Sequence, residues 1–347
     1  MNGAEGGSAG LESGIVLVDK PRGVTSHDVV SALRSVMGTR QVGHGGTLDP
    51  LATGLLIVGF GKATRLLSYV IGSAKTYEAT IRLGVATTTD DLEGERMDLG
   101  PARRDVETIT RDELIGLVSR SYVGEIQQVP SRYSAVRIDG RHAYELARKG
   151  TDFTIEPRTV TIHRFDVGGC RRSTACFEEG ASAVDVLDVD VRITCSSGTY
   201  IRSIARDMGQ DLAVGGHLTA LRRVSVGEFD VADAHTERAR AVERTITRRD
   251  GSRRTVLSAR FDDPETVRGH AISMSDAARK VLPVVSISSD DAERLRYGKR
   301  IDIAVRGSTA AIHTGGSGSD TVDDLVAIIE PSGARESRPT VVFPDRG

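Results

Sequence analysis

The sequence predicts an α+β protein, in which strands and helices come in runs rather than as regular βαβ units. Short β-branched runs bounded by glycine or proline are frequent, and amphipathic helical segments lie between groups of them. The chain has 347 residues, of which 39% are hydrophobic, so it can bury a sizeable core. This length predicts two or three domains, or one large domain with an appendage.

Composition excludes several classes of protein. Trp is absent and aromatic residues make up only 4%, which argues against binding by an extended aromatic surface. No apolar run approaches the roughly 18–20 residues of a membrane helix, and no signal-peptide pattern is present. The three cysteines, Cys170, Cys176 and Cys195, have no zinc-ligand spacing and leave an odd thiol. We therefore expect a cytoplasmic protein without membrane association.

The net charge of −2 hides a strong local separation of charge. Residues 14–85 contain 8 basic and 4 acidic side chains, whereas residues 86–113 contain 4 basic and 9 acidic ones. Residues 235–260 contain 8 basic and 3 acidic side chains. Local basic surfaces bind polyanions, so the near-neutral total does not exclude a nucleic-acid partner.

The N-terminal part is expected to hold three strands and one helix. Residues 1–13, rich in Gly, Ser and Ala, are predicted to be a disordered tail. A helix is predicted over residues 27–37, capped by Ser26, because its apolar residues share one face. Strands are predicted over residues 14–20, 54–59 and 76–83, with a glycine-rich loop over residues 42–48.

The middle of the chain alternates helical and extended patterns. Residues 90–105 are predicted to form an acidic loop. Helices are predicted over residues 111–119 with Thr110 as the cap, over 141–149 ending at Gly150, and over 200–212. Strands are predicted over residues 159–167 and 183–195, joined by a loop over 168–182.

The C-terminal part is expected to be a small β-rich domain. Residues 235–260 are rich in arginine and lack apolar periodicity, which predicts a solvated insertion. A helix is predicted over residues 275–281, ending before Pro283. Short strands are predicted over residues 284–287, 300–305, 325–330 and 340–343.

The densest chemical signal is the segment VGHGGTLDPLATGL over residues 42–55. Its glycines bracket one aspartate, Asp49, and Pro50 restricts the backbone directly after it. A carboxylate held on a rigid loop, with glycines on both sides, leaves room for a bulky substrate. The alternative is that Asp49 caps the following turn and the glycines serve only the bend.

Three further segments carry candidate residues. Arg202 follows a Ser-Ser-Gly turn, where a guanidinium can keep a carboxylate ionised and orient it, or can form a salt bridge that only joins two segments. Tyr77 can stack on a flat ligand, although an isolated strand tyrosine is more often a core residue. Residues 130–150 interleave basic and aromatic side chains, as RNA-binding segments do, or form a solvated helix face.

With these segments in view, the chain resembles the bacterial tRNA pseudouridine-55 synthases of the TruB type. Six segments carry the resemblance in the family's order between residues 14 and 229: VDKPRGVTSHDVV, GHGGTLDPLATGLL, KTYEATIRLG, PSRYSAVRIDGRHAYELARKG, CSSGTYIRSIARDMG and GGHLTALRRVSVGEF. The long GHGGTLDPLATG stretch is the most specific of them. A weaker similarity over LPVVSISSDDAERLRYGKRI and VVFP points to the family's PUA-like C-terminal domain.

The resemblance implies a pseudouridine synthase fold with a large mixed, mostly antiparallel sheet and flanking helices. It implies a catalytic domain over residues 14–282 and a PUA-like domain over residues 283–347. Residues 130–150 match the family's mobile thumb, which closes on RNA. Residues 168–182 and 235–272 depart from a compact family member, and the second stretch is read as a basic insertion.

The resemblance also implies roles for individual residues. Asp49 matches the catalytic aspartate, and the substrate-binding positions are matched by His44, Tyr77, Tyr200, Arg202, Leu221 and Lys20. Among these, Tyr77 matches the tyrosine that stacks on the target uracil, Arg202 the arginine paired with the aspartate, and His44 the histidine that helps to remodel the T loop. Leu221 matches a pocket-lining leucine, and Lys20 and Tyr200 match positions thought to support the pocket.

The implied reaction is an isomerisation of a tRNA uridine, so no cofactor and no metal are required. The target uridine in the T stem-loop must be flipped out, at a cost of a few kcal/mol. Whether Asp49 attacks C6 of the base, attacks C1′ or helps to remove the C2′ proton stays open. Two rivals are a non-catalytic RNA-binding protein on the same scaffold and a guide-RNA-dependent relative. A metal hydrolase is disfavoured because the histidines show no ligand spacing. We expect a monomer.

Overall fold

The computed structural model describes residues 11–98, 100, 104–177, 183–247, 250–315 and 322–344. Residues 1–10 of the predicted tail therefore lie outside the described residues. The chain divides into two compact units: a first unit of residues 1–50, 54–73 and 227–347, and a second unit of residues 51–53 and 74–226. The boundary expected at residue 283, between the catalytic domain and the PUA-like domain, stays a prediction. No helix among the described ranges is long and apolar enough to span a membrane.

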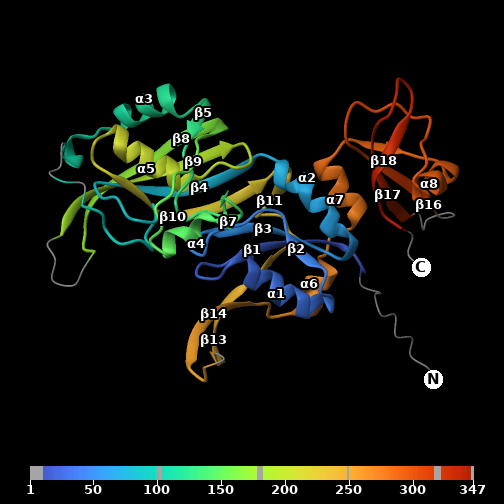
Figure 1. Ribbon diagram of the computed structural model, residues 1–347, viewed down its shortest axis with the longest axis horizontal. Helices are drawn as coiled ribbons and strands as arrows, with labels where there is room; N and C mark the ends of the chain where they lie inside the picture. The colour runs from blue at the N-terminus through green and yellow to red at the C-terminus, as the bar shows by residue number, and fades with distance from the viewer. Residues whose placement is uncertain are drawn as a thin grey trace. The chain divides into compact units, whose positions relative to one another are not determined.

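The second unit is built on a five-stranded antiparallel sheet in the order β10–β4–β9–β8–β5 (Figure 1). The strands are β4 (Lys75–Leu83), β5 (Gly124–Gln128), β8 (Arg158–Ala175), β9 (Val184–Cys195) and β10 (Gly216–Val226). The other elements are the 3-10 helix η2 (Val106–Thr108), the helices α3 (Arg111–Ser121), α4 (Ala143–Arg148) and α5 (Ile201–Asp211), and the short strands β6 (Arg137–Ile138) and β7 (Arg141–His142). The predicted cap of α3 is confirmed, because the Thr110 side chain accepts a hydrogen bond from the Glu113 amide.

Close packing of α5 against β10 depends on two glycines. A Cβ added at Gly209 would lie 2.1 Å from the Gly216 amide nitrogen, and one added at Gly216 would lie 2.3 Å from the Ala205 carbonyl oxygen. These distances are too short for any side chain, so the helix backbone touches the strand backbone directly. This contact places the first turn of α5 relative to the sheet, which matters because that turn carries Arg202.

The first unit contains a mixed sheet. Strand β1 (Gly14–Lys20) pairs in parallel with β12 (Thr236–Arg238) and antiparallel with β3 (Thr53–Phe60), which also pairs with β2 (Val42–His44). The remaining elements are α1 (Ser26–Met37), η1 (Gly61–Leu66), α2 (Leu67–Gly72), β11 (Phe229–Asp230), α6 (Pro264–Gly269) and α7 (Met274–Val281). Strands in runs with helices beside them confirm the α+β prediction.

The predicted cap of α1 is wrong by one residue. Thr25 is the cap: its hydroxyl accepts from the Asp28 amide at 3.1 Å, and the Asp28 carboxylate accepts from the Thr25 amide at 2.8 Å. This is a capping box. Ser26 is instead buried, and its hydroxyl is bonded to the Leu48 backbone.

The predicted loop at residues 168–182 is wrong over its first half. Strand β8 runs on to Ala175 and pairs with the start of β9, from Cys170 opposite Val189 to Ala175 opposite Val184. Residues 178–182 lie outside the described part. The extension was missed because most of its side chains are exposed, so it lacks the apolar alternation that marks a half-buried strand.

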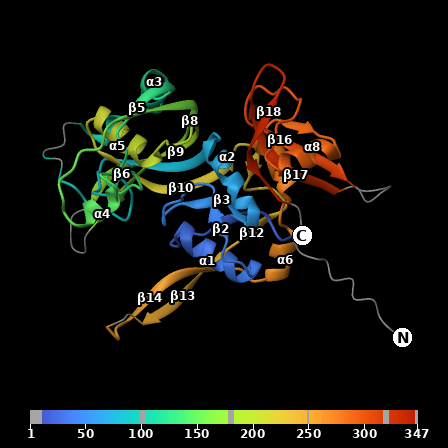
Figure 2. The same ribbon diagram turned by 45° about the vertical axis from the view of Figure 1, so that its right-hand side comes forward.

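The arginine-rich segment at residues 235–260 is also more ordered than predicted. It forms β12 and then a hairpin of β13 (Arg240–Thr247) and β14 (Arg253–Arg260), paired over all eight residues of each strand. In Figures 1 and 2 the hairpin extends beyond α1 and α6. A two-stranded ribbon has no core face, so its sequence shows no apolar period.

The C-terminal residues form a four-stranded sheet in the order β15–β16–β17–β18. Its elements are β15 (Val284–Ser286), α8 (Ser289–Arg296), β16 (Thr309–Gly315), β17 (Val322–Pro331) and β18 (Ser337–Val342). The strand predicted over residues 300–305 is wrong, since only Ile301 forms an isolated bridge, to Ser337. Ile301, Ile303 and Val305 alternate because they pack on the hydrophobic cluster of this sheet, not because they join its ladder.

Candidate active site

The Asp49 loop connects β2 to β3 and is anchored on both sides of the aspartate. The Ser26 hydroxyl donates to the Leu48 carbonyl oxygen at 3.1 Å and accepts from the Leu48 amide at 2.9 Å. The Pro50 carbonyl oxygen accepts from the Gly23 amide at 2.8 Å. Leu48 and Leu51 are buried, whereas Asp49 is partly exposed. The backbone on both sides of Asp49 is therefore held in place.

Two glycines allow the tight approach that this loop needs. A Cβ at Gly45 would lie 2.8 Å from Val70 Cγ1 on α2. Gly46 has a φ of 116°, which side-chain-bearing residues rarely adopt. The glycines thus serve the bend, as the simpler interpretation proposed, and they also bring the loop close to α2.

Lys20 supports the same loop from the end of β1. Its side chain is fully buried, and its ammonium donates to the carbonyl oxygens of Val24 at 2.8 Å, Pro21 at 3.0 Å and Pro50 at 3.4 Å. A buried ammonium needs such acceptors, because its desolvation is costly. Lys20 therefore ties the turn after β1 to the residue that follows Asp49. His44 lies nearby in sequence on β2, paired with Val58 and partly exposed.

Tyr77 and Leu221 share one face of the sheet in the second unit. Tyr77 on β4 lies opposite Arg223 on β10, and Leu221 lies opposite Ala79. Residues two apart on a strand point to the same face, so all four side chains lie on one side. Tyr77 is 8% exposed and Leu221 9% exposed. The sheet register brings these two predicted residues together.

Arg223 and Lys75 are charged residues of this face that sequence analysis missed. Arg223 is 1% exposed and stands directly opposite Tyr77. Lys75 precedes Tyr77 by two residues, and burial, followed by the charge of Arg223, lowers the pKa of its ammonium to about 8. A signal was present for Arg223, which follows Leu221 in the basic LRR stretch.

Arg202 joins two loops at the first turn of α5. One guanidinium nitrogen donates to the Thr89 carbonyl oxygen at 3.0 Å and lies 3.4 Å from the Asp91 carboxylate. The other donates to the Tyr133 carbonyl oxygen at 3.0 Å. Arg202 and Asp91 are both buried. The pair with Asp91 was not anticipated, because Asp91 lies within a segment predicted only as an acidic loop.

Asp91 is itself held in a fixed orientation. One of its carboxylate oxygens accepts from the Thr89 hydroxyl and from the Glu93 amide, at 3.0 Å for the latter. The Thr87 hydroxyl donates to the Asp91 carbonyl oxygen at 2.7 Å. The loop over residues 87–91 is therefore rigid, and it presents its second carboxylate oxygen to Arg202.

Tyr200 caps α5 and contacts the predicted thumb. Its amide donates to Gln128 Oε1 at 2.8 Å, and Gln128 Nε2 donates back to the Tyr200 carbonyl oxygen at 3.1 Å. Its side chain packs on a small cluster of Val136, Ala143 and Ile155. Tyr200 thus supports the junction between α5 and residues 130–150 rather than belonging to the sheet face of Tyr77.

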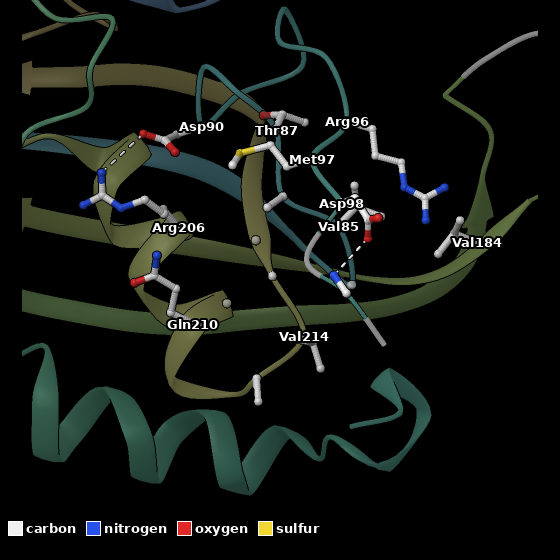
Figure 3. Close-up of a pocket in the computed structure, with 17 residues that line it drawn as sticks. Val85, Thr87, Asp90, Arg96, Met97, Asp98, Val184, Arg206, Gln210 and Val214 are labelled. Atoms are coloured by element: carbon white, nitrogen blue, oxygen red, sulfur yellow. Dashed lines mark hydrogen bonds and ion pairs between the residues drawn. The ribbon is translucent and has the colours of Figure 1, made fainter. Parts of the chain in front are cut away.

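One turn beyond Arg202, Arg206 lines a pocket of about 540 Å³ (Figure 3). Its guanidinium donates to the Val129 carbonyl oxygen at 2.7 Å and lies 3.5 Å from the Asp90 carboxylate. Burial raises the pKa of Asp90, against the opposing effect of Arg206. Arg202 and Arg206 together hold the 87–91 loop and the start of the thumb segment against α5.

Comparisons with known proteins identify the family. The model of the TruB family pseudouridylate synthase N-terminal domain matches residues 34–201, and that of the tRNA pseudouridylate synthase B C-terminal domain matches residues 202–272. The chain belongs to the TruB family. The resemblance inferred from the six sequence segments is confirmed, and the protein is a pseudouridylate synthase.

Curated relatives match nearly the whole chain. The tRNA pseudouridine synthase B of Bifidobacterium longum (strain NCC 2705) is 40% identical and covers 96% of this chain and 98% of its own. Those of Arthrobacter sp. (strain FB24) and Thermobifida fusca are 44% and 43% identical, and cover 93% and 96% of this chain and 90% and 99% of their own.

Solved structures confirm the fold of this TruB family member. An H/ACA ribonucleoprotein bound to a substrate RNA containing 2′-deoxyuridine matches with a TM-score of 0.60 at 22% identity, over 96% of this chain and 86% of that one. A Cbf5–Nop10–Gar1 complex matches with a TM-score of 0.59 at 22% identity, over 96% and 84%. At this identity the match concerns the fold alone, and the pseudouridine synthase fold is as predicted.

Proposed function

We propose that the protein isomerises the uridine at position 55 in the T loop of tRNA to pseudouridine, with Asp49 as the catalytic residue. The observation that carries this proposal is the Asp49 loop, in which the backbone is bonded at Leu48 and Pro50 and Asp49 between them is a partly exposed residue. The curated relatives are named tRNA pseudouridine synthase B, which supports tRNA as the substrate.

The reaction breaks the N1–C1′ bond, turns the base and joins C5 to C1′. The proton released from C5 is balanced by one taken up at N1, so no oxidant or reductant is needed. An ionised Asp49 can attack C6, attack C1′ or remove the C2′ proton, and all three routes require its negative charge. The proposal therefore rests on the carboxylate and not on one route.

The face that carries Tyr77 and Leu221 would receive the flipped base. Tyr77 offers a flat ring on a face that also carries Arg223 and Lys75, and Leu221 lies one diagonal position away on the neighbouring strand. Stacking on an aromatic ring contributes about 1–3 kcal/mol, which offsets part of the cost of flipping the base. We further propose that Arg202, which matches the family's paired arginine, belongs to the same substrate-binding site as Tyr77.

The thumb segment would hold the tRNA backbone. Arg137, Arg141 and Lys149 are exposed, and Arg132 stacks over the Phe153 ring at 4.3 Å. Tyr200 and Arg202 join this segment to α5, so its position is coupled to the site. We further propose that His44 contacts the T loop and that Lys20 holds the Asp49 loop in place. We also propose that the enzyme acts as a monomer in the cytoplasm.

The test is turnover by the Asp49→Asn variant. Tritium release from C5-labelled uridine in a T-stem-loop transcript should fall below detection, because the amide keeps the shape of the carboxylate but lacks its charge. Binding of the transcript should stay near the wild-type level. Asp302→Asn, at a carboxylate that is 79% exposed, is the matched control and should leave turnover unchanged. Activity of Asp49→Asn within tenfold of wild type would rule out the proposed role.

The same assay separates a stand-alone enzyme from its two rivals. Turnover on a transcript, with no other RNA or protein added, means that no guide RNA is needed. Binding without turnover by the wild-type protein would instead favour a non-catalytic RNA-binding role.

A further inference from the structure

The hairpin of β13 and β14 has one face that carries most of its arginines. Its register pairs Arg240 with Arg260, Arg244 with Val256 and Ile246 with Arg254. Because side chains alternate along a strand, paired residues and those two apart share a face. The first face, here called the arginine face, consists of Arg240, Val242, Arg244, Ile246, Arg254, Val256, Ser258 and Arg260. The opposite face carries one arginine, Arg253, and one acidic residue, Glu243.

The opposite face of the hairpin touches the rest of the first unit at Leu257. Leu257 lies on the opposite face, and its Cδ1 would be only 2.7 Å from a Cβ added at Gly23. That contact places Leu257, which is 42% exposed, next to the turn after β1. All four arginines of the arginine face are exposed.

Few acidic side chains lie close enough to these arginines to neutralise their charge. Within the described ranges, Arg240 is the one that has a carboxylate at ion-pair distance, Asp262 at 3.3 Å, and both side chains are about two-thirds exposed. Arg240 also stands directly opposite Arg260, a like-charge pair that destabilises a ribbon. Two-stranded ribbons are marginally stable by themselves. The arrangement therefore does not serve folding, and it fits a polyanionic partner.

The hairpin of β13 and β14 is connected to the Asp49 loop through two contacts. Leu257 touches Gly23, and the Gly23 amide donates to the Pro50 carbonyl oxygen at 2.8 Å, next to Asp49. The hairpin therefore lies next to the turn that is bonded to the Asp49 loop, which would bind the target uridine. Residues 235–260 contain no Phe, Tyr or Trp, so the ribbon cannot stack on bases and suits phosphates.

We infer that the arginine face binds the phosphate backbone of the double-helical stem that flanks the target uridine; this inference rests on the proposed function. The contact is independent of RNA sequence, because it depends only on the phosphate charges and on the shape of the RNA helix. It contributes to affinity and not to the chemical step, since no ribbon residue belongs to the site. An anionic membrane surface is the competing partner for the same charges.

The test compares neighbouring arginines on opposite faces of the full-length protein. Arg244→Gln with Arg254→Gln removes two charges from the arginine face, and Arg253→Gln removes one from the other face. Affinity for a tRNA transcript is measured between 50 and 200 mM salt. The slope of log affinity against log salt should become less steep by about 2 in the double variant. The affinity deficit of the double variant should then shrink about tenfold across that range. Arg253→Gln should keep the wild-type slope.

The single-turnover rate at saturating enzyme should be the same in all three proteins. Wild-type slopes in the double variant, or an equal change per charge in Arg253→Gln, would overturn the inference. Unchanged tRNA binding with lost binding to phosphatidylserine vesicles would assign the face to a membrane instead. If the wild-type protein bound tRNA with the expected slopes but formed no pseudouridine, the proposed function would fail while the ribbon inference stood.

Discussion

Replacement of Arg202 by lysine tests whether this residue orients its surroundings or only supplies a charge. The guanidinium donates from two different nitrogens to the carbonyl oxygens of Thr89 and Tyr133, both at 3.0 Å, and contacts Asp91 at 3.4 Å. A lysine ammonium is a point donor on a flexible stem and cannot reach both loops with the same geometry. Arg202→Lys should therefore release either the 87–91 loop or the thumb segment.

The expected loss of stability follows from these contacts. A hydrogen bond to a charged group contributes about 1.5–3 kcal/mol, and the substitution removes at least one of two. The loss should stay below the roughly 3–5 kcal/mol of a broken buried ion pair, because lysine keeps the charge near Asp91. We expect the free energy of unfolding to fall by about 2–3 kcal/mol. Displacement of the site by about 1 Å would lower the single-turnover rate by about 100-fold.

Urea denaturation and single-turnover tritium release on the same preparation measure the two effects. Arg120→Lys, at an exposed position of α3, is the matched control and should change neither quantity. An Arg202→Lys variant with wild-type turnover would refute the orienting role and leave a simple charge effect. A loss of stability with wild-type turnover would mean that Arg202 only ties two segments together.

Three further predictions follow from the second unit. Tyr77→Phe should keep the stacking ring and bind the stem-loop normally, whereas Tyr77→Ala should lose binding and about 3–5 kcal/mol of stability; wild-type turnover of both would show a plain core residue. Gly209→Ala should destabilise the protein or prevent its folding, because the added Cβ would meet the Gly216 amide nitrogen at 2.1 Å, and a wild-type urea midpoint would contradict the direct backbone contact. Burial lowers the pKa of Lys75 to about 8, below its unfolded value of about 10.4, so the unfolded state binds more protons between these pH values. Stability should therefore rise with pH across that window in wild type, and a rise of equal size in Lys75→Met would exclude Lys75 as its source.

Local signals in the sequence were enough to predict much of the protein. The strand at residues 14–20, the helix capped by Thr110 and the helix ending before Pro283 form as predicted, because caps, β-branched runs and prolines act within a few residues. The same kind of local signal predicts a candidate site at the glycine-bracketed Asp49 segment. Its long, specific motif also identified the family, which the comparisons confirm.

Other features depend on contacts between distant residues, and no local pattern encodes them. Arg202 meets Thr89 and Tyr133 from 113 and 69 positions away. The burial of Arg223 opposite Tyr77 depends on strand register. The segregation of arginines on the β13–β14 hairpin likewise depends on which residues pair, since a slip of one residue would move every side chain of one strand to the other face. The end of β8 and the strands β13 and β14 lack the apolar alternation that marks a buried face, so only their backbone hydrogen bonds show that they are strands.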